Sequence, residues 1–165
     1  MKKISEFSVY MLIIVLFISF SACNKAKPLI GTYEGVTTTS GKYKFIIPDY
    51  DEMEDVIPSE NKNVTFEITK GSEKNQIILK QTGGESDEQF QTTGIINGKN
   101  VAFEPFDISI GYGDINVKVQ ANDMSGTFDD GLFTYNYSYN YYQSLMGASV
   151  SIRMKASGSA QKNKK

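Results

Sequence analysis

The sequence contains no histidine, no tryptophan and only one cysteine among its 165 residues. The lack of histidine removes the commonest general base and the commonest metal ligand. A single cysteine cannot form an intramolecular disulfide, a Cys-x-x-Cys redox pair or a cysteine-based zinc site. A Ser-His-Asp or Cys-His catalytic centre is therefore excluded, and we expect a protein that is not an enzyme and carries neither a cofactor nor a metal.

The sequence also lacks an excess of charge of either sign, because 17 basic and 19 acidic side chains leave a net charge of −2. Nucleic-acid-binding domains are usually strongly basic, so nucleic acid is not an expected partner. The length predicts a single domain, which we expect to be a monomer. The hydrophobic content of 40% is sufficient for a packed core.

The N-terminus has the order of residues that is typical of a secretory signal. The basic pair Lys2-Lys3 precedes an apolar run from Val9 to Phe20, and the small residues Ser21-Ala22 follow. The run is 12 residues long, whereas a membrane-spanning helix needs about 20. We therefore predict that residues 1–22 are a helical signal peptide, and the residue that follows is the only cysteine, Cys23.

The segment Phe20-Ser21-Ala22-Cys23 resembles a lipobox, in the loose form typical of the lipoproteins of Bacteroidota. The resemblance implies that cleavage follows Ala22 and that acyl chains such as palmitate on Cys23 anchor the mature chain in a membrane. Asn24 in place of Asp favours the outer membrane, and the absence of an acidic cluster in Asn24–Lys27 favours its periplasmic face over the cell surface. A plain secretory signal or an uncleaved anchoring helix is the alternative.

Alternating apolar and polar residues predict β-strands throughout the mature chain. The alternation is seen in residues 42–47, 64–69, 115–120 and 150–155. One polar and one apolar face per strand is typical of antiparallel sheets. We expect eight to ten short strands that form a small antiparallel β-barrel, with a β-sandwich as the alternative.

The turn residues and the composition of the C-terminal tail predict further boundaries within the mature chain. Asn97-Gly98 and Asp130-Gly131 lie between strand segments and predict tight hairpin turns. Residues 23–29 are predicted to be a tether and residues 30–156 the barrel domain. Residues 157–165 are rich in Gly, Ser, Lys and Asn, which predicts a disordered basic tail.

One predicted strand, Leu132–Tyr142, places five aromatic side chains on one face; they are Phe133, Tyr135, Tyr137, Tyr139 and Tyr141. Four of the five carry a hydroxyl group, which costs about 1–3 kcal/mol when it is buried without a partner. A row of tyrosines therefore suits the partly wet wall of a ligand pocket. A core face with its hydroxyls at the rim and a contact surface for protein or glycan are the alternatives.

The segment Gly31-Thr32-Tyr33-Glu34-Gly35 and the segment Ser125–Gly131 together resemble the calycin superfamily, and in particular the small lipocalin-like lipoproteins of Bacteroidota. The resemblance implies a lipocalin-like barrel that holds one small apolar ligand or is filled by side chains. It also implies that Tyr33 replaces the tryptophan that closes the barrel base. Arg153, the only arginine, would then be its stacking partner.

An acidic cluster, which includes Asp49, Asp51, Glu52, Glu54 and Asp55, suits either a solvated loop or a weak Ca²⁺ site, although it lacks the EF-hand spacing. Taken together, these features predict a cell-envelope lipoprotein whose barrel binds a small apolar or amphipathic ligand. The alternative is a structural module that contacts envelope proteins or glycans. An enclosed cavity above roughly 300 Å³ beside the tyrosines would favour the ligand carrier.

Overall fold

The computed structural model describes residues 25–84, 89–112 and 115–164. Cys23 and the predicted signal helix lie outside these residues. The described chain has one short 3₁₀ helix and nine strands, which are η1 (Lys27–Leu29), β1 (Gly31–Ile46), β2 (Met53–Lys70), β3 (Gln76–Gly84), β4 (Gln91–Asn97), β5 (Asn100–Phe103), β6 (Phe106–Tyr112), β7 (Ile115–Asp129), β8 (Leu132–Leu145) and β9 (Ala148–Lys162).

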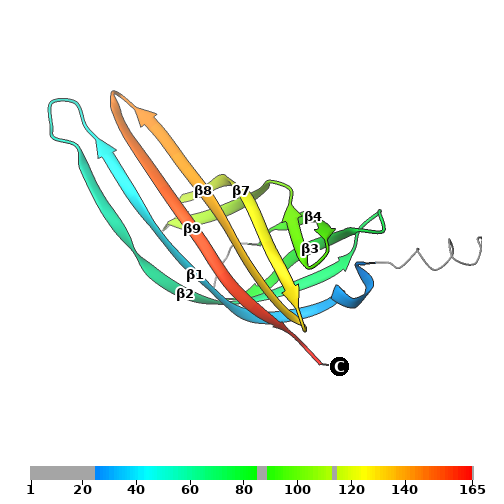
Figure 1. Ribbon diagram of the computed structural model, residues 1–165. Helices are drawn as coiled ribbons and strands as arrows, with labels where there is room; N and C mark the ends of the chain where they lie inside the picture. Colours follow the sequence, from blue (N-terminus) through cyan, green and yellow to red (C-terminus); the bar gives the residue numbers. More distant parts are fainter. Residues whose placement is uncertain (1–24, 85–88, 113–114, 165) are drawn as a thin grey trace, which may run out of the picture.

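The strands form one antiparallel sheet in the order β5-β4-β3-β2-β1-β9-β8-β7-β6 (Figure 1). An additional pairing between β5 and β7 closes this sheet into a ring. The two short strands share β7, because β5 pairs with Ser125–Thr127 and β6 pairs with Ile115–Ala121. The prediction of an antiparallel β-barrel is confirmed, and the sandwich alternative is excluded.

Both predicted hairpin turns are present. Asn97-Gly98 links β4 to β5, and Asp130-Gly131 links β7 to β8. Gly98 and Gly131 have φ angles of 65° and 78°, which glycine adopts without the steric cost that a Cβ atom would add. These two turns lie at one end of the barrel, which we call the base, together with the start of β1 and the end of β9.

The interior of the barrel is apolar and its outer surface is polar. Along β8 the odd-numbered residues from Phe133 to Tyr139 are buried. By contrast, Asn136, which lies between them, and Asn140, which follows Tyr139, are exposed. Every buried side-chain nitrogen or oxygen in the described part of the chain has a hydrogen-bond partner. The period of two in the sequence therefore corresponds to the inside and the outside of the barrel.

Small residues make room for the aromatic side chains of β8. The residues of β9 opposite Phe133, Tyr135 and Tyr137 are Ala160, Gly158 and Ala156. A Cβ atom at Gly158 would lie only 2.6 Å from the Tyr135 hydroxyl oxygen, so the close approach of the tyrosine requires glycine. Large rings on one strand and small side chains on the next fill the barrel together.

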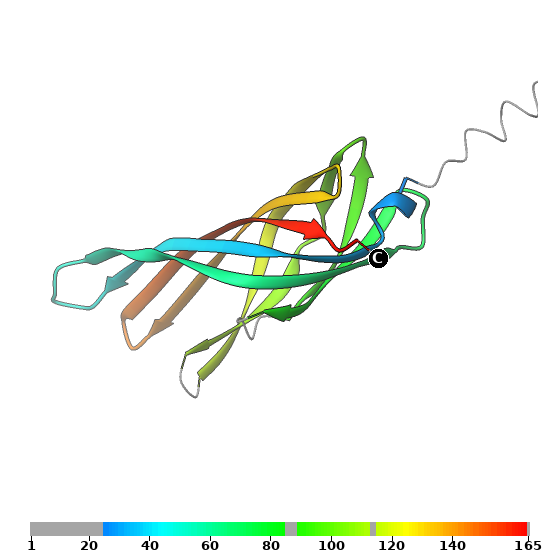
Figure 2. The ribbon, with the colours of Figure 1, turned by 90° about the horizontal axis from the view of Figure 1, so that it is seen from below.

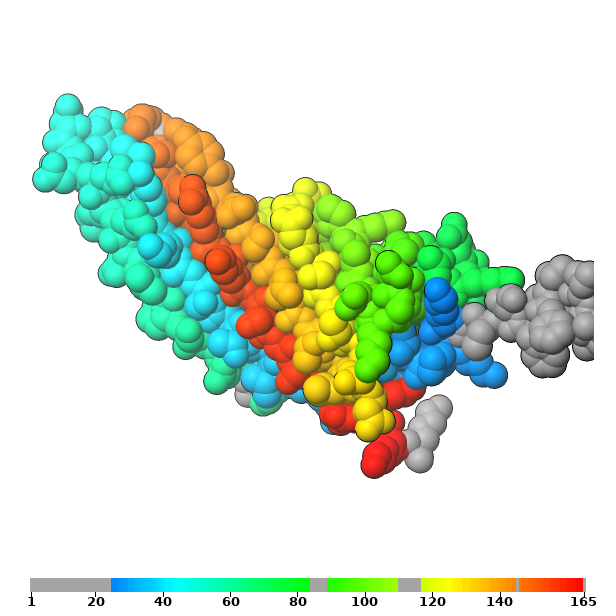
Figure 3. Space-filling view, in the orientation of Figure 1, coloured from blue at the N-terminus to red at the C-terminus, as the bar shows by residue number. Residues whose placement is uncertain are grey.

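Four strands are far longer than the ring requires. β1, β2, β8 and β9 have 16, 18, 14 and 15 residues, while a typical strand has about five or six. Their distal parts project from the barrel as an extension of the same sheet, which is visible in Figures 1 and 3. We call this sheet the arm; it consists of residues 41–46, 53–57, 140–145 and 148–154.

Two irregularities lie where the arm leaves the barrel. The register of β1 and β2 shifts between Thr39 and Gly41, and that of β7 and β8 shifts between Asn122 and Ser125. Asp123, in the second irregularity, has a φ angle of 57°. β-Bulges bend the strand that contains them. Beyond this level β7 no longer pairs with β8, and the β6–β7 hairpin diverges from the arm (Figure 1).

The structure corrects the predicted tail and domain boundary. Residues 157–162 belong to β9 and pair with both β1 and β8, so the barrel extends to Lys162 and not to residue 156. Ala160 is 1% exposed in this segment. The Gly-Ser-Ala composition that suggested disorder is instead the set of small residues that the aromatic side chains of β8 require.

The predicted tether also has contacts with the barrel. Ala26 is buried, and Leu29 packs against the hydrophobic core from the one-turn helix η1. No helix of the described residues is long and apolar enough to cross a membrane.

We expect that removal of residues 157–165 abolishes cooperative thermal unfolding measured by circular dichroism. The deletion leaves main-chain groups of β1 and β8 without partners, at about 1–3 kcal/mol for each buried group. Removal of Lys164-Lys165 alone is the control, because these two residues follow β9, and it should leave the melting temperature close to that of the parent. An unchanged transition in the longer deletion would contradict the assignment of these residues to the barrel.

Candidate functional site

The five aromatic residues predicted as a pocket wall lie on one face of β8; we call them the aromatic ladder (Phe133, Tyr135, Tyr137, Tyr139 and Tyr141). The first four are at most 5% exposed, and Tyr141 is partly buried against the core. The alternation in the sequence thus correctly identified which side chains share a face. The structure places most of that face in the packed interior.

Other aromatic rings fill the space in front of the ladder. The ring of Phe66 meets that of Tyr135 edge to face at a centroid distance of 5.1 Å. Phe106 stacks on Phe90 at 4.2 Å and meets Tyr137 at 5.8 Å. Such pairs add to the energy of area burial. The lower part of the ladder is therefore a core face.

The hollows beside the ladder are open to the outside of the barrel. One of about 630 Å³ borders Tyr135, and one of about 420 Å³ borders Tyr137. Exposed residues of the outer surface, among them Asn136 and Ser157, line both hollows. Neither hollow is the enclosed cavity that a ligand carried inside the barrel would occupy.

Tyr135 is held in the interior by a hydrogen bond. Its hydroxyl group bonds the hydroxyl group of Thr37 on β1, and both side chains are buried. Burial raises the pKa of Tyr135 to about 12, although the hydrogen bond with Thr37 lowers it in part. The buried hydroxyl group of Tyr135 therefore has a hydrogen-bond partner, Thr37, which the sequence analysis did not identify.

Tyr33 lies at the base of the barrel, where the resemblance predicted it. Its ring meets Phe128 and Phe133 edge to face at 5.9 Å and 6.3 Å. Its hydroxyl group donates a hydrogen bond of 2.9 Å to the carbonyl of Leu29, which joins the barrel to η1. Burial raises the pKa of Tyr33 to about 12.

Arg153 does not lie near Tyr33. The residue of β9 that pairs with Tyr33 is Lys162, whereas Arg153 pairs with Lys42 in the arm. Nine residues of extended strand separate the two positions, or about 30 Å at 3.3 Å per residue. Arg153 is exposed on the outer face of the arm, so the predicted stacking pair is not formed.

Lys162 has a structural role that the sequence did not reveal. Its ammonium group donates a hydrogen bond of 2.7 Å to the carbonyl of Pro28, so the last strand is joined to the segment that precedes the first. Gln161 and Lys162, together with Gly31 and Gly131, also line a hollow of about 830 Å³ at the base. No signal in the sequence separates this lysine from the others near the C-terminus.

The inner face of the arm continues the apolar face of the barrel. Cross-strand pairing gives two rows that face the same side; one contains Asp55, Tyr43, Ile152 and Tyr141, and the next contains Met53, Phe45, Val150 and Gln143. The Phe45 side chain is 40% exposed, and Tyr43, Ile152 and Val150 are partly exposed. A hollow of about 260 Å³ at the end of the arm is lined by Phe45, Ile47, Gln143, Ala148, Ser149 and Val150.

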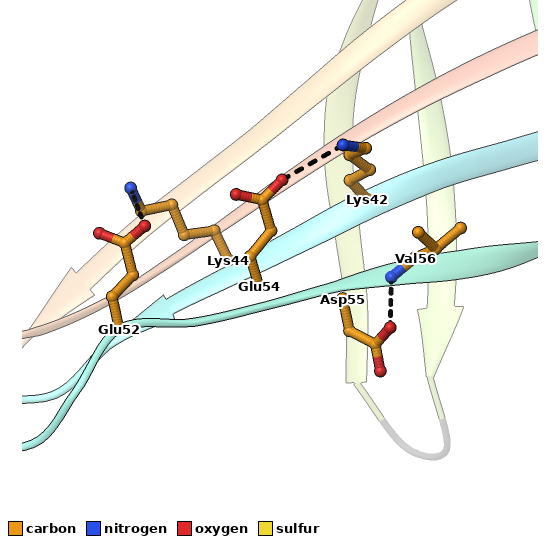
Figure 4. A network of polar contacts seen from close by, with 6 residues as sticks. All are labelled: Lys42, Lys44, Glu52, Glu54, Asp55 and Val56. Atoms are coloured by element: carbon orange, nitrogen blue, oxygen red, sulfur yellow. Dashed lines mark hydrogen bonds and ion pairs between the residues drawn. The ribbon is translucent and has the colours of Figure 1, made fainter.

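The outer face of the arm is charged, as Figure 4 shows. The Lys42 ammonium lies 3.4 Å from the Glu54 carboxylate, and the Lys44 ammonium lies 2.6 Å from the Glu52 carboxylate. These contacts engage two members of the acidic cluster that suggested a Ca²⁺ site. In the part of the chain that the structure describes, no three acidic side chains come close enough together to hold a metal ion.

We expect the free energy of unfolding to fall as the pH rises above about 10. Tyrosine in an unfolded chain has a pKa of about 10, while Tyr33 and Tyr135 in the folded protein have pKa values of about 12. The stabilisation is therefore fully present below about pH 10, and it is lost between these values because the unfolded chain releases protons that the folded protein retains. Urea titrations over this range measure the effect.

The Tyr135→Phe variant should show a smaller decrease of stability with pH than the parent. Tyr50→Phe is the matched control, because the Tyr50 side chain is 77% exposed, and it should behave as the parent does. The same decrease in all three proteins would contradict the assignment of the effect to the buried tyrosines.

Comparisons with known proteins give no family. No protein-family model matches the chain. No curated protein matches the sequence either.

Two solved structures match this chain distantly. Ail, the attachment invasion locus protein of Yersinia pestis, is 8% identical with a TM-score of 0.36, over 79% of this chain and 99% of that one. Transferrin binding protein B of Haemophilus parasuis, described as a vaccine antigen, is 16% identical with a TM-score of 0.35 over 82% of this chain. The match spans only 27% of the latter protein. At these values neither protein assigns a family or a function, and the chain is described by its own strand pairing as an antiparallel β-barrel with a projecting arm.

Proposed function

We propose that this protein is a cell-envelope lipoprotein, anchored through acylated Cys23, that binds a small apolar or amphipathic ligand. The observation that carries the ligand is the inner face of the arm. There Phe45, Ile47 and Met53 are exposed and lie next to the partly exposed Tyr43 and Val150. Contiguous exposed apolar surface is typical of a binding site.

The position of the ligand differs from the sequence prediction. The aromatic ladder from Phe133 to Tyr139 is packed against other rings inside the barrel, and the hollows that border it open to the outside. Its last member, Tyr141, shares a cross-strand row with Tyr43 and Ile152 on the arm. The ligand would therefore contact the distal end of the aromatic face, where the barrel is open.

Two features suit attachment at the base of the barrel. The short helix η1 lies beside the base, where it is joined to Tyr33 and Lys162, and the C-terminal end of β9 lies there as well (Figure 2). An acylated Cys23 would precede Ala26, which is buried against the barrel, by three residues. The arm would then point away from the membrane, with its apolar inner face accessible to a ligand in the surrounding aqueous phase.

A protein or glycan contact is the second candidate function, and one observation favours it. The inner face of the arm is an open surface, whereas pockets for small molecules bury most of the surface of their ligand. The first function predicts that a small molecule stays bound to the purified protein. The second predicts that a protein or glycan binds to it instead. The lack of histidine, together with the assignment of the only cysteine to lipid attachment, supports a non-enzymatic role in either case.

We expect Cys23→Ser to release the protein from the membrane fraction. The substitution removes the thiol that would take the diacylglycerol, and each buried methylene contributes about 0.8 kcal/mol to anchoring. Fractionation followed by intact-mass measurement tests this result, since the parent should carry the mass of its acyl chains. A parent protein without added mass, or a variant that stays in the membrane, would disprove the anchor.

Native mass spectrometry of the protein extracted from its own membrane tests the ligand. We expect a discrete non-covalent adduct on the parent, and about a tenfold lower occupancy on Phe45→Lys, because a lysine would place a charge on the apolar inner face. Ile46→Lys is the matched control. Ile46 is the next residue, lies on the outer face and is 42% exposed, compared with 40% for Phe45.

Either of two results would count against the ligand. One is a parent protein free of adduct while a known lipocalin keeps its ligand under the same conditions. The other is an adduct that both lysine variants retain equally, since the site would then not lie on the inner face of the arm. In the first case the contact surface becomes the better function.

A further inference from the structure

The arm has two strand edges that no other strand of the described chain covers. β7 pairs with β8 only as far as Tyr139, so Asn140–Leu145 pairs with β9 alone. On the opposite side β3 pairs with β2 only from Val64 onward, so Met53–Lys62, in the arm and next to it, pairs with β1 alone among the described strands. An open edge presents main-chain donors and acceptors to any strand that can add to it.

The open edge of β2 carries features that oppose strand addition. Pro58 has no main-chain N–H to donate, and Glu54, Asp55 and Glu60 outnumber the single basic residue Lys62. The main-chain N–H of Val56 donates a hydrogen bond of 2.7 Å to the Asp55 carboxylate, so this donor is already engaged (Figure 4). Two such edges would also repel each other.

The open edge of β8 carries no such protection. Its sequence, Asn-Tyr-Tyr-Gln-Ser-Leu over residues 140–145, contains no charged residue and no proline. The Tyr142 side chain is 69% exposed on the outer face, and Met146 in the following turn is 95% exposed. Uncharged, unprotected edges with exposed apolar neighbours are sites of pairing with another chain.

The β7 strand does not cover this edge. Its residues Ile115–Gln120 pair with β6, and the irregularity between Asn122 and Ser125 lies where its pairing with β8 ends. In Figure 1 the described end of β6 and start of β7 lie apart from the end of β8. No strand of the described residues covers this edge, so a strand of another molecule can add to it.

We infer that the β8 edges of two copies of this chain pair antiparallel about a two-fold axis, so that two arms form one continuous sheet. A second copy is the partner that the charge distribution favours, because an uncharged edge meets an identical one without repulsion. An identical strand also has the matching length, and a two-fold interface needs only one self-complementary surface. The sequence alone gave no sign of an open edge, which is why it predicted a monomer.

The register of this pairing decides what the dimer does. In an antiparallel pair the residue numbers of every two opposed residues have the same sum. When this sum is even, inner-face residues of one copy lie opposite inner-face residues of the other. The inner faces of both arms then lie on the same side of the sheet, because alternate residues of a strand face opposite sides. The two apolar inner faces then form one continuous surface. This inference goes beyond the proposed function, and it holds whether or not the inner face binds a small ligand.

Cysteine scanning of the full-length protein in its own membrane tests the dimer. Tyr141, Tyr142, Gln143 and Ser144 are changed to cysteine one at a time, and disulfide-linked dimers are measured on non-reducing gels after mild oxidation. In an even register one of these residues lies opposite its own copy, at about 4.5–5.5 Å between Cα atoms, which a disulfide can bridge. We expect one sharp maximum among the four positions.

The controls use the parent protein and the other open edge. The parent reports any contribution of Cys23, and Ser59→Cys on β2 reports random collision. No dimer above these controls at any of the four positions would overturn the inference. Equal cross-linking at all four positions, or as much at Ser59→Cys, would overturn it as well, since neither result indicates a defined pairing.

A charge at the edge provides a second, independent measurement. The mass of the detergent-solubilised parent, determined by analytical ultracentrifugation, should be that of a dimer. Tyr142→Lys should reduce the mass to that of a monomer, because the two lysines would lie close together across the two-fold axis. Ser59→Lys, on the protected edge of β2, should remain a dimer. A monomeric parent, or a Tyr142→Lys protein that remains a dimer, would contradict the pairing.

Discussion

The packing of the aromatic side chains of β8 against small residues of β9 is the interaction on which the rest of the structure depends. Ala156, Gly158 and Ala160 lie opposite Tyr137, Tyr135 and Phe133, and their small size leaves room for the large rings. The rings then reach Phe66 and Phe106 on the far side of the barrel and fill its interior. Because the interior is closed by side chains in this part, any ligand must bind at the open end or outside.

The same interaction determines where the barrel ends and the arm begins. Past Ala156 the residues of β9 on the inner face become Met154, Ile152 and Val150, which are large. At about this level β7 separates from β8 and the register of β1 and β2 shifts. The inner face therefore stays apolar while the strands that would cover it are no longer there. Two consequences follow from this one change, namely an exposed apolar face and an unpaired edge of β8.

The outer surface shows how the protein keeps the rest of the arm from associating. Ion pairs of Lys42 and Lys44 with Glu54 and Glu52 cover the outer face, and Pro58 and the Asp55 carboxylate protect the edge of β2. Exposed ion pairs of this kind contribute little to stability, but they keep the outer face of the arm charged. The edge of β8 is the part of the arm without this protection, which is why it is the candidate for self-association.

The sequence by itself determined the strands, the hairpin turns and the side of each strand that faces inward, because these depend on a period of two and on turn residues that act locally. It also identified Tyr33 at the base and the five residues of the aromatic ladder as one face. It misjudged residues 157–162, because Gly, Ser and Ala are typical of flexible tails and also of strands that must lie close to large rings. Only the tertiary structure decided that Arg153 and Tyr33 lie far apart, that the ladder is packed and that β8 has an open edge. These properties depend on which strands are neighbours and where their pairing ends, and strand length and neighbour choice are not contained in local alternation.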